Sequence, residues 1–265
     1  MDKLLYVAMT GAAGALQQQA SNNHNLANIN TTGFKADLEA SMAIELPQPL
    51  PTRVFTDVNS SGFDRTPGEL KFTGRELDVA ISGEGYIAVL GTDGETAYTR
   101  NGNLRVAPSG MLENAAGHAV LGNQGPIMLP PYESINIAAD GSINFKPAGG
   151  GAESVQLDRI RLVSDPEAKL EKLSDGTFRP PPELIRRTRL GGDGATNNVS
   201  LQEQIPELDE DPNVNIVRGA LEGSNVNITD TMVKMIELAR LYEMQVKLMR
   251  TAEENDTATT RLVNG

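Results

Sequence analysis

The sequence predicts an α+β protein in which helices from the two ends of the chain pair as a coiled-coil-like domain beside a central antiparallel all-β domain. Two observations support this fold class: heptad-like apolar spacing near both termini, and short apolar runs separated by glycine turns between them. The expected division is a discontinuous helical assembly domain at 1–40 and 216–265, an extended linker at 41–65 and a β domain at 66–215.

The C-terminal segment has the clearest helical pattern. From Ile228 onward, apolar residues recur in alternating steps of four and three, which is the spacing of a coiled-coil seam. Leu238, Leu241 and Leu248 widen this stripe on one side, so that more than one helical partner is expected. Asn227, Thr229 and Asp230 are candidate N-caps. The residues expected to pack against other helices are Met232, Met235, Ala239, Tyr242, Val246 and Met249.

The N-terminal segment repeats the same spacing with smaller side chains, at Leu5, Ala8, Ala12 and Ala15. Small residues allow a partner helix to approach closely. Gly11 and Gly14 each cost about 1 kcal/mol relative to alanine inside a helix. Because such a helix is marginal alone, it is expected to pair with the C-terminal helix or with another chain.

The middle of the chain is predicted to be β. Leu77, Val79 and Ile81 alternate with other residues, and turn signals such as Asp93-Gly94 and Asn101-Gly102 follow at short intervals. No helical pattern lies between these runs, which favours antiparallel sheets over a βαβ fold. The sequence Pro-Gln-Pro-Leu-Pro at 47–51 predicts the extended linker.

Composition excludes several classes of function. The 265 residues include 23 Lys and Arg against 35 Asp and Glu, and the resulting net charge of −12 disfavours nucleic-acid binding. The absence of cysteine and the presence of two histidines exclude disulfides, thiolate metal sites and histidine-rich metal sites. No metal and no cofactor is therefore expected. No apolar run is long enough for a membrane-spanning helix, and the N-terminus is a poor signal peptide that we expect to be retained.

Signatures of catalysis are sparse. Gly83-Glu84-Gly85 lacks both the third glycine and the following helix of a dinucleotide-binding fingerprint. No G-x-S-x-G nucleophile elbow occurs. We therefore expect no catalytic residues and no small-molecule substrate.

An asparagine-rich segment is the most unusual feature, with five asparagines in residues 22–30 before Thr31-Thr32-Gly33-Phe34. Asparagine favours helix ends and turns, so this segment is consistent with a helix end followed by a turn at Gly33. Its amides also carry donors and an acceptor without charge, which suits a polar contact repeated between subunits. The sequence leaves both interpretations open.

The same segment resembles the N-terminal signature of the flagellar rod and hook protein family. Met235–Lys247 is similar to the C-terminal helix of that family, and Leu77–Tyr86 with Tyr98–Gly102 to its central domain. The residues that the resemblance assigns to an assembly motif are His24, Asn25, Leu26, Ala27, Asn28, Thr31, Thr32, Gly33 and Phe34.

The resemblance implies a non-enzymatic structural subunit of the basal-body rod, which crosses the periplasm. Such subunits polymerise through their terminal helices into an axial tube that transmits torque. Their implied partners are other rod proteins and the flagellar type III export apparatus, through which they leave without a cleaved signal peptide. Met1–Met9, His24, Lys35–Leu38 and Leu221–Asn225 favour the proximal part of the rod over the distal part.

Three other functions are alternatives to a proximal rod subunit. The first is a distal rod subunit of the same family. The second is a secreted β-domain binding protein with a helical oligomeric stalk, and the third is a hydrolase on a β scaffold. A rod subunit predicts open, head-to-tail assembly, whereas an oligomeric stalk predicts a closed oligomer.

Overall fold

The computed structural model describes residues 2–45, 54–148, 153–188 and 199–264. The chain divides into two compact units. The helical unit consists of Met1–Thr31, Lys35–Thr66 and Ser224–Gly265, and the β unit of Thr32–Phe34 and Pro67–Gly223. Neither of the described helices combines the length and apolarity that crossing a membrane requires.

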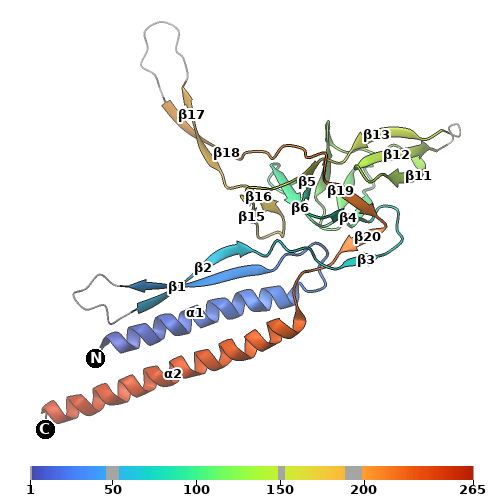
Figure 1. The fold of residues 1–265 in the computed structure, drawn as a ribbon. Coiled ribbons are helices and arrows are strands. Elements are labelled where there is room, and N and C mark those ends of the chain that lie inside the picture. Colours follow the sequence, from blue (N-terminus) through green and yellow to red (C-terminus); the bar gives the residue numbers. More distant parts are fainter. Residues whose placement is uncertain (1, 46–53, 149–152, 189–198, 265) are drawn as a thin grey trace, which may run out of the picture. The chain divides into compact units, whose positions relative to one another are not determined.

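The helical unit contains α1 (Asp2–Ala27) and α2 (Ile228–Asn264), which run antiparallel and contact each other along their length (Figure 1). The start of α1 and the end of α2 therefore lie at the same end of the pair. Asn227 caps α2, because its Oδ1 accepts hydrogen bonds from the backbone N–H groups of Thr229 (2.9 Å) and Asp230 (3.4 Å). This confirms Asn227 among the three predicted cap residues.

A β-hairpin packs against α1 in the same unit. Its strands are β1 (Asp37–Glu45) and β2 (Val54–Phe63), paired antiparallel with a register shift between Leu38 and Glu39. Sequence analysis expects an extended linker at 41–65, whereas most of this range is strand. The proline-rich 47–51 lies outside the described residues. The alternation of Leu38, Ala40, Met42 and Ile44 with more polar residues is the strand signal that the prolines obscured.

The β unit is built from short antiparallel strands, as predicted. Its largest sheet has the order β15-β16-β6-β5-β9-β8-β7, with β10 paired to β9 and β14 to β5. These strands are β5 (Tyr86–Leu90), β6 (Thr96–Thr99), β7 (Leu104–Val106), β8 (Leu112–Asn114), β9 (Ala119–Gly122), β10 (Gly125–Pro126), β14 (Leu162–Val163), β15 (Glu171–Lys172) and β16 (Phe178–Arg179).

Smaller sheets complete the described part of the unit. One has the order β11-β12-β13, and the remaining strands pair as β17-β18, β19-β4 and β20-β3. They are β3 (Leu70–Phe72), β4 (Val79–Ser82), β11 (Tyr132–Ile137), β12 (Ser142–Pro147), β13 (Val155–Arg159), β17 (Glu183–Thr188), β18 (Val199–Gln204), β19 (Asn215–Arg218) and β20 (Ala220–Glu222).

Alternating strand residues form one apolar core in the β unit. It includes residues from the strands predicted by alternation, such as Val79 and Ile81, and residues of the continuous run Ile87–Val89. At about 25 cal/mol per Å² of buried apolar surface, such a core is the main favourable contribution to folding.

The last two strands of the β unit lie in a segment that sequence analysis assigns to the helical domain. Residues 216–222 belong to β19 and β20, which pair with β4 and β3. The helical unit resumes only at Ser224, and α2 begins at Ile228. The short alternation Ile216-Val217-Arg218 is too brief to distinguish from the start of a helix in sequence.

Candidate assembly interface

The small residues of α1 form its contact with α2. Ala8, Ala12 and Ala15 are 2–5% exposed, as expected for a packed helix face. A Cβ atom added to Gly11 would lie 3.0 Å from the side-chain Cδ of Gln245 on α2. The glycine that weakens α1 as an isolated helix therefore also lets α2 approach closely.

The predicted stripe of α2 is only partly covered. Met235, Ala239, Tyr242, Val246 and Met249 are half-buried within the chain. Two other residues of the predicted packing set are exposed: Met232 is 52% exposed and Leu5 on α1 is 41% exposed. The helix pair therefore leaves part of its expected packing surface open.

Both helices also present apolar side chains on faces that the pair does not cover. Most were not predicted from the sequence, because they lie outside the heptad spacing. Large exposed apolar side chains gathered on two adjacent helices are typical of a protein–protein contact surface. Apart from Leu5 and Met232, they are Tyr6, Met9 and Leu16 on α1, and Ile228, Val233, Ile236, Leu241, Met244 and Leu248 on α2.

Two asparagines of the asparagine-rich segment make contacts inside the helical unit: Asn25, which belongs to the assembly motif, and Asn22, which precedes it. The Asn25 side chain donates to the backbone O of Asp37 (3.0 Å) and accepts from its N–H (2.8 Å), so that it pairs with the start of β1. Asn22 donates to the backbone O of Thr231 on α2 at 2.8 Å. Each of these asparagines is 9% exposed. Their amides thus connect α1 to β1 and to α2.

The other motif residues in this unit lie at the C-terminal end of α1. His24 Nδ1 lies 2.6 Å from Asp37 Oδ2. The Asn28 side chain donates to the backbone O of His24, and the Thr31 hydroxyl donates to Asn28 Oδ1. Leu26 is half-buried and Ala27 exposed. These contacts match the helix-end interpretation of the asparagine-rich segment.

Thr32, Gly33 and Phe34 belong to the β unit. Gly33 has φ of 70°, a conformation that favours glycine, and its N–H donates to the backbone O of Glu222 at 2.8 Å. The buried Phe34 ring lies 3.7 Å from the Nζ of Lys172. Thr32 is half-buried. The predicted turn at Gly33 is thus confirmed.

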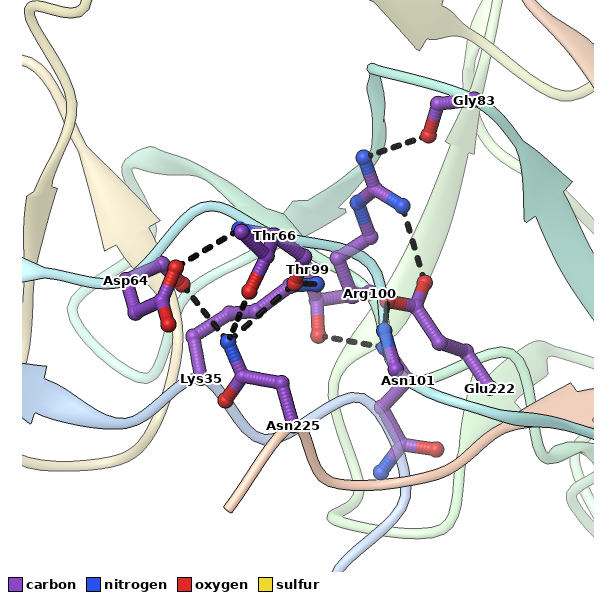
Figure 2. A network of polar contacts seen from close by, with 10 residues as sticks. Lys35, Asp64, Thr66, Gly83, Thr99, Arg100, Asn101, Glu222 and Asn225 are labelled. Carbon is purple, nitrogen blue, oxygen red and sulfur yellow. Dashed lines mark hydrogen bonds and ion pairs between the residues drawn. The ribbon is translucent and has the colours of Figure 1, made fainter. Parts of the chain in front are cut away.

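A buried ion pair in the β unit connects this turn with two distant segments. Figure 2 shows Arg100 between the carboxylate of Glu222 (Nη1–Oε2, 2.8 Å) and the backbone O of Gly83 (Nη2–O, 2.8 Å). The two charged side chains are 2% and 1% exposed. The other Glu222 oxygen accepts from the N–H of Gly68 at 2.9 Å. Glu222 thus holds Gly33, Gly68 and Arg100 together.

A second polar cluster lies in the helical unit. The Asn225 side chain accepts from the N–H of Ala36 (2.8 Å) and donates to the backbone O atoms of Asp64 and Thr66 (Figure 2). The fully buried Lys35 donates from Nζ to the same Thr66 O at 2.7 Å. Asn225 therefore ties the segment before α2 to both ends of the β1–β2 hairpin.

The roles of Arg100, Glu222 and Asn225 were not predicted from the sequence. All three lie in segments that carry the family resemblance, Tyr98–Gly102 and Leu221–Asn225. The Arg100–Glu222 pair and the contacts of Asn225 each join residues more than 100 positions apart, so no local pattern indicated these roles.

Tyr98 makes the alkaline stability of the β unit testable. Burial raises the pKa of its phenol, whose oxygen accepts from the N–H of Leu208 at 2.7 Å. The neutral phenol thus contributes stability that is fully present below about pH 10, the ordinary tyrosine value, and is lost as pH rises through the higher folded value. We expect wild-type protein to lose stability above about pH 10 and Tyr98→Phe to lack that loss.

At pH 7 the Tyr98→Phe substitution should cost about 1 kcal/mol, because the Leu208 N–H loses its acceptor. Denaturant melting between pH 7 and pH 11 measures both effects. Tyr6→Phe serves as the control, because Tyr6 is 54% exposed. An alkaline loss of equal size in Tyr98→Phe and wild type would contradict the assignment.

Within the residues described, no group of three or more histidine, aspartate and glutamate side chains is placed to hold a metal ion. The segment 207–211 is rich in acidic residues, and one of them, Glu207, contacts protein groups. Its carboxylate accepts a hydrogen bond from the Thr96 hydroxyl on β6 at 2.9 Å and forms an ion pair with Arg161 at 3.1 Å.

Comparison with known proteins agrees with the fold and the motifs. Residues 217–262 match the model described as "Flagellar basal body rod FlgEFG protein C-terminal", and residues 80–145 match "Flagellar hook protein FlgE/F/G D1 domain". The flagellar basal-body rod protein FlgF of Escherichia coli K12 is 38% identical over 100% of this chain and 99% of its own length.

Two further relatives cover nearly the same length. FlgF of Salmonella typhimurium is 37% identical over 100% of this chain and 99% of its own. FlgG of Agrobacterium fabrum is 30% identical over 93% of this chain and 95% of its own. The match thus extends across both terminal helices and the β unit. The chain is therefore a structural subunit of the flagellar basal-body rod and belongs to the flagellar rod and hook FlgE/F/G family.

Proposed function

We propose that this subunit is built into the proximal part of the rod through α1 and α2, which contact helices of neighbouring subunits and form an axial tube that transmits torque. The single observation that carries the proposal is the set of large apolar side chains left exposed on both helices. Exposure of these side chains to water is unfavourable for a single chain. Helices of neighbouring subunits would bury them, which contributes about 25 cal/mol of free energy per Å² of apolar surface.

The heptad stripe of α2 supports a coiled-coil-like arrangement of these helices. Five of its residues, Met235, Ala239, Tyr242, Val246 and Met249, are half-buried within the chain, and Leu241 and Leu248 beside them are exposed. A stripe of this width accommodates helices on more than one side. The assembly motif and the helix-packing residues then act at two levels, within the chain and between chains.

The proximal position rests on the similarity pattern. The two FlgF relatives named above are 37–38% identical to this chain and the FlgG relative is 30% identical, whereas FlgF of Buchnera aphidicola and of Caulobacter vibrioides is 27–28% identical. A distal position is the alternative. An affinity tag on this chain can be marked with gold-labelled antibody. The position of the gold along purified basal bodies, measured by electron microscopy, distinguishes a proximal from a distal location.

The subunit is further proposed to act without catalysis, cofactor, nucleic acid or small-molecule substrate, and to be exported by the flagellar type III apparatus without cleavage of its N-terminus. Its partners are other rod proteins. The absence of an enzyme motif in the sequence and the structural character of the family support this part of the proposal.

The substitution Val246→Asp tests assembly through α2. Val246 is half-buried on the predicted stripe, and burying an unpaired carboxylate there costs several kcal/mol, roughly. We expect Val246→Asp to be absent from purified basal bodies and to abolish motility. Quantitative immunoblotting of basal bodies measures incorporation.

Thr251→Asp is the matched control, because it adds the same charge at an exposed position of the same helix. It should be incorporated like wild type. Melting of each purified variant checks that the β unit remains folded. Wild-type incorporation of Val246→Asp would refute assembly through this stripe.

A further inference from the structure

A groove in the helical unit opens between α1, β1 and α2 and has a volume of about 380 Å³. Its lining is both acidic and apolar: Asp37, Leu38 and Glu39 come from β1, and Lys234, Glu237 and Leu241 from α2. Leu38 is 44% exposed and Leu241 36% exposed. Three carboxylates against one ammonium give the groove a local excess of negative charge.

Glu39 is incompletely satisfied in this groove. Ser21 donates a hydrogen bond to its carboxylate, but the buried Oε2 atom has no hydrogen-bond partner among the described residues. Burial raises the pKa of this carboxyl group, and the neighbouring Asp37 adds to that effect. Asp37 itself already pairs with His24. A buried carboxylate oxygen without a donor is costly, and a cation bound in the groove beside Glu39 would offset that cost.

The same chain carries a surface of complementary chemistry on α2. Arg240 and Lys247 lie seven residues apart, so they share one side of the helix, and Met244 lies between them. All three are exposed, Met244 by 57%. Neither cation has a carboxylate partner in the part of the chain that the structure describes. We call Arg240, Met244 and Lys247 the basic face.

We propose that the groove receives the basic face of a second copy of this chain, with Arg240 or Lys247 pairing with Glu39 and Met244 packing between Leu38 and Leu241. The inference rests on the proposed function and adds which surfaces of adjacent copies meet. A net charge of −12 repels copies at long range, so a contact between them requires local charge matching of this kind.

The geometry of the contact suits open assembly. The groove and the basic face consist of different residues of the chain, so a head-to-tail contact leaves each copy with one unused groove or one unused face. Heterologous contacts of this type produce rings or helical filaments rather than closed two-fold dimers. The contact thus agrees with a tubular assembly.

Engineered cysteines test the contact directly, because the natural chain has none. Two differently tagged full-length copies, one carrying Leu38→Cys and one carrying Met244→Cys, replace the native chain in cells. After oxidation of purified basal bodies, we expect a disulfide-linked dimer containing both tags. Either cysteine variant alone should give no mixed dimer. Leu38→Cys combined with Thr257→Cys, at an exposed site outside the basic face, should also give no mixed dimer.

Charge variants in this cross-linking pair test the role of Glu39. Glu39→Gln should lower the dimer yield about tenfold or more, as for loss of one partner of a buried ion pair. The control Glu253→Gln removes an exposed carboxylate of α2 outside the groove and should leave the yield unchanged. Glu39→Arg on one copy and the pair Arg240→Glu, Lys247→Glu on the other should each lower the yield, and their combination should restore it.

The outcomes separate this inference from the proposed function. Both copies present in basal bodies without a mixed dimer, or Leu38→Cys linked to a different rod protein, would overturn the contact while leaving the rod function intact. A wild-type chain absent from basal bodies would overturn both. If the cysteine copies are not incorporated, the same charge variants in the cysteine-free chain decide, with chain recovered per basal body as the measurement.

Discussion

Glu222→Gln should lower the free energy of unfolding of the β unit by about 3–5 kcal/mol, the cost of leaving one charge of a buried ion pair without its partner. Arg100 is 2% exposed and cannot recover water when the carboxylate is removed. Glutamine keeps an oxygen for the N–H of Gly68, so the loss reports mainly on the charge. Urea melting of the full-length chain at pH 7 measures the effect.

Glu113→Gln is the matched control. It removes the carboxylate of another arginine pair, with Arg105, whose side chain is 57% exposed. Exposed pairs contribute about 0–1 kcal/mol, so the control should melt close to wild type. Equal melting of the two variants would show that the buried pair does not hold the β unit together. Replacing Arg100 and Glu222 together by Met and Leu should recover much of the loss, because the uncompensated charge disappears.

Periodicity was sufficient to predict the helices and the class of the β unit. The steps of four and three at Ala8, Ala12 and Ala15 identify the face of α1 that is buried in the structure. The alternation of Val79 and Ile81 identifies a strand whose apolar residues lie in the core. Both signals are local, because the burial of one face of an element repeats with the period of that element.

Pairing between distant segments was not available from the sequence. Arg100 and Glu222 are 122 residues apart, and nothing near either residue indicates the other. The β1–β2 hairpin was missed for a different reason, since prolines at 47–51 dominate the interpretation of that segment. Charged residues such as Arg240 and Lys247 also separate the exposed apolar residues of α2 in sequence, so no continuous apolar run marks them.

The asparagine-rich segment makes both local contacts and contacts with residues distant in sequence. The asparagine signal correctly indicated a helix end, because Asn28 and Thr31 make contacts within a few residues. The contacts of Asn25 with Asp37 and of Asn22 with Thr231 depend on the tertiary structure. Within the chain the segment therefore forms a helix end and joins α1 to β1 and α2, and a polar contact of its amides with other subunits stays a prediction.

Gly33→Ala is expected to be the other strongly destabilising single substitution. Two effects add at this position. A side chain is strained at φ of 70°, and an added Cβ would lie 2.4 Å from the backbone C of Arg100. The turn has to move to relieve this overlap, which also displaces the Gly33 N–H from the Glu222 oxygen. We expect a loss of about 3 kcal/mol or more, at the upper end of single-substitution effects.

Gly94→Ala separates the two effects, because Gly94 has φ of 82° but nothing within 4 Å of an added Cβ. Conformational strain alone should cost it about 1–2 kcal/mol. Since a Cβ added at Gly33 would press on the backbone of Arg100, whose side chain pairs with Glu222, the double variant Gly33→Ala, Glu222→Gln should lose less stability than the two single losses combined. Urea melting of the four proteins of this cycle gives the coupling, and strict additivity would mean that the glycine turn and the buried ion pair stabilise the β unit independently.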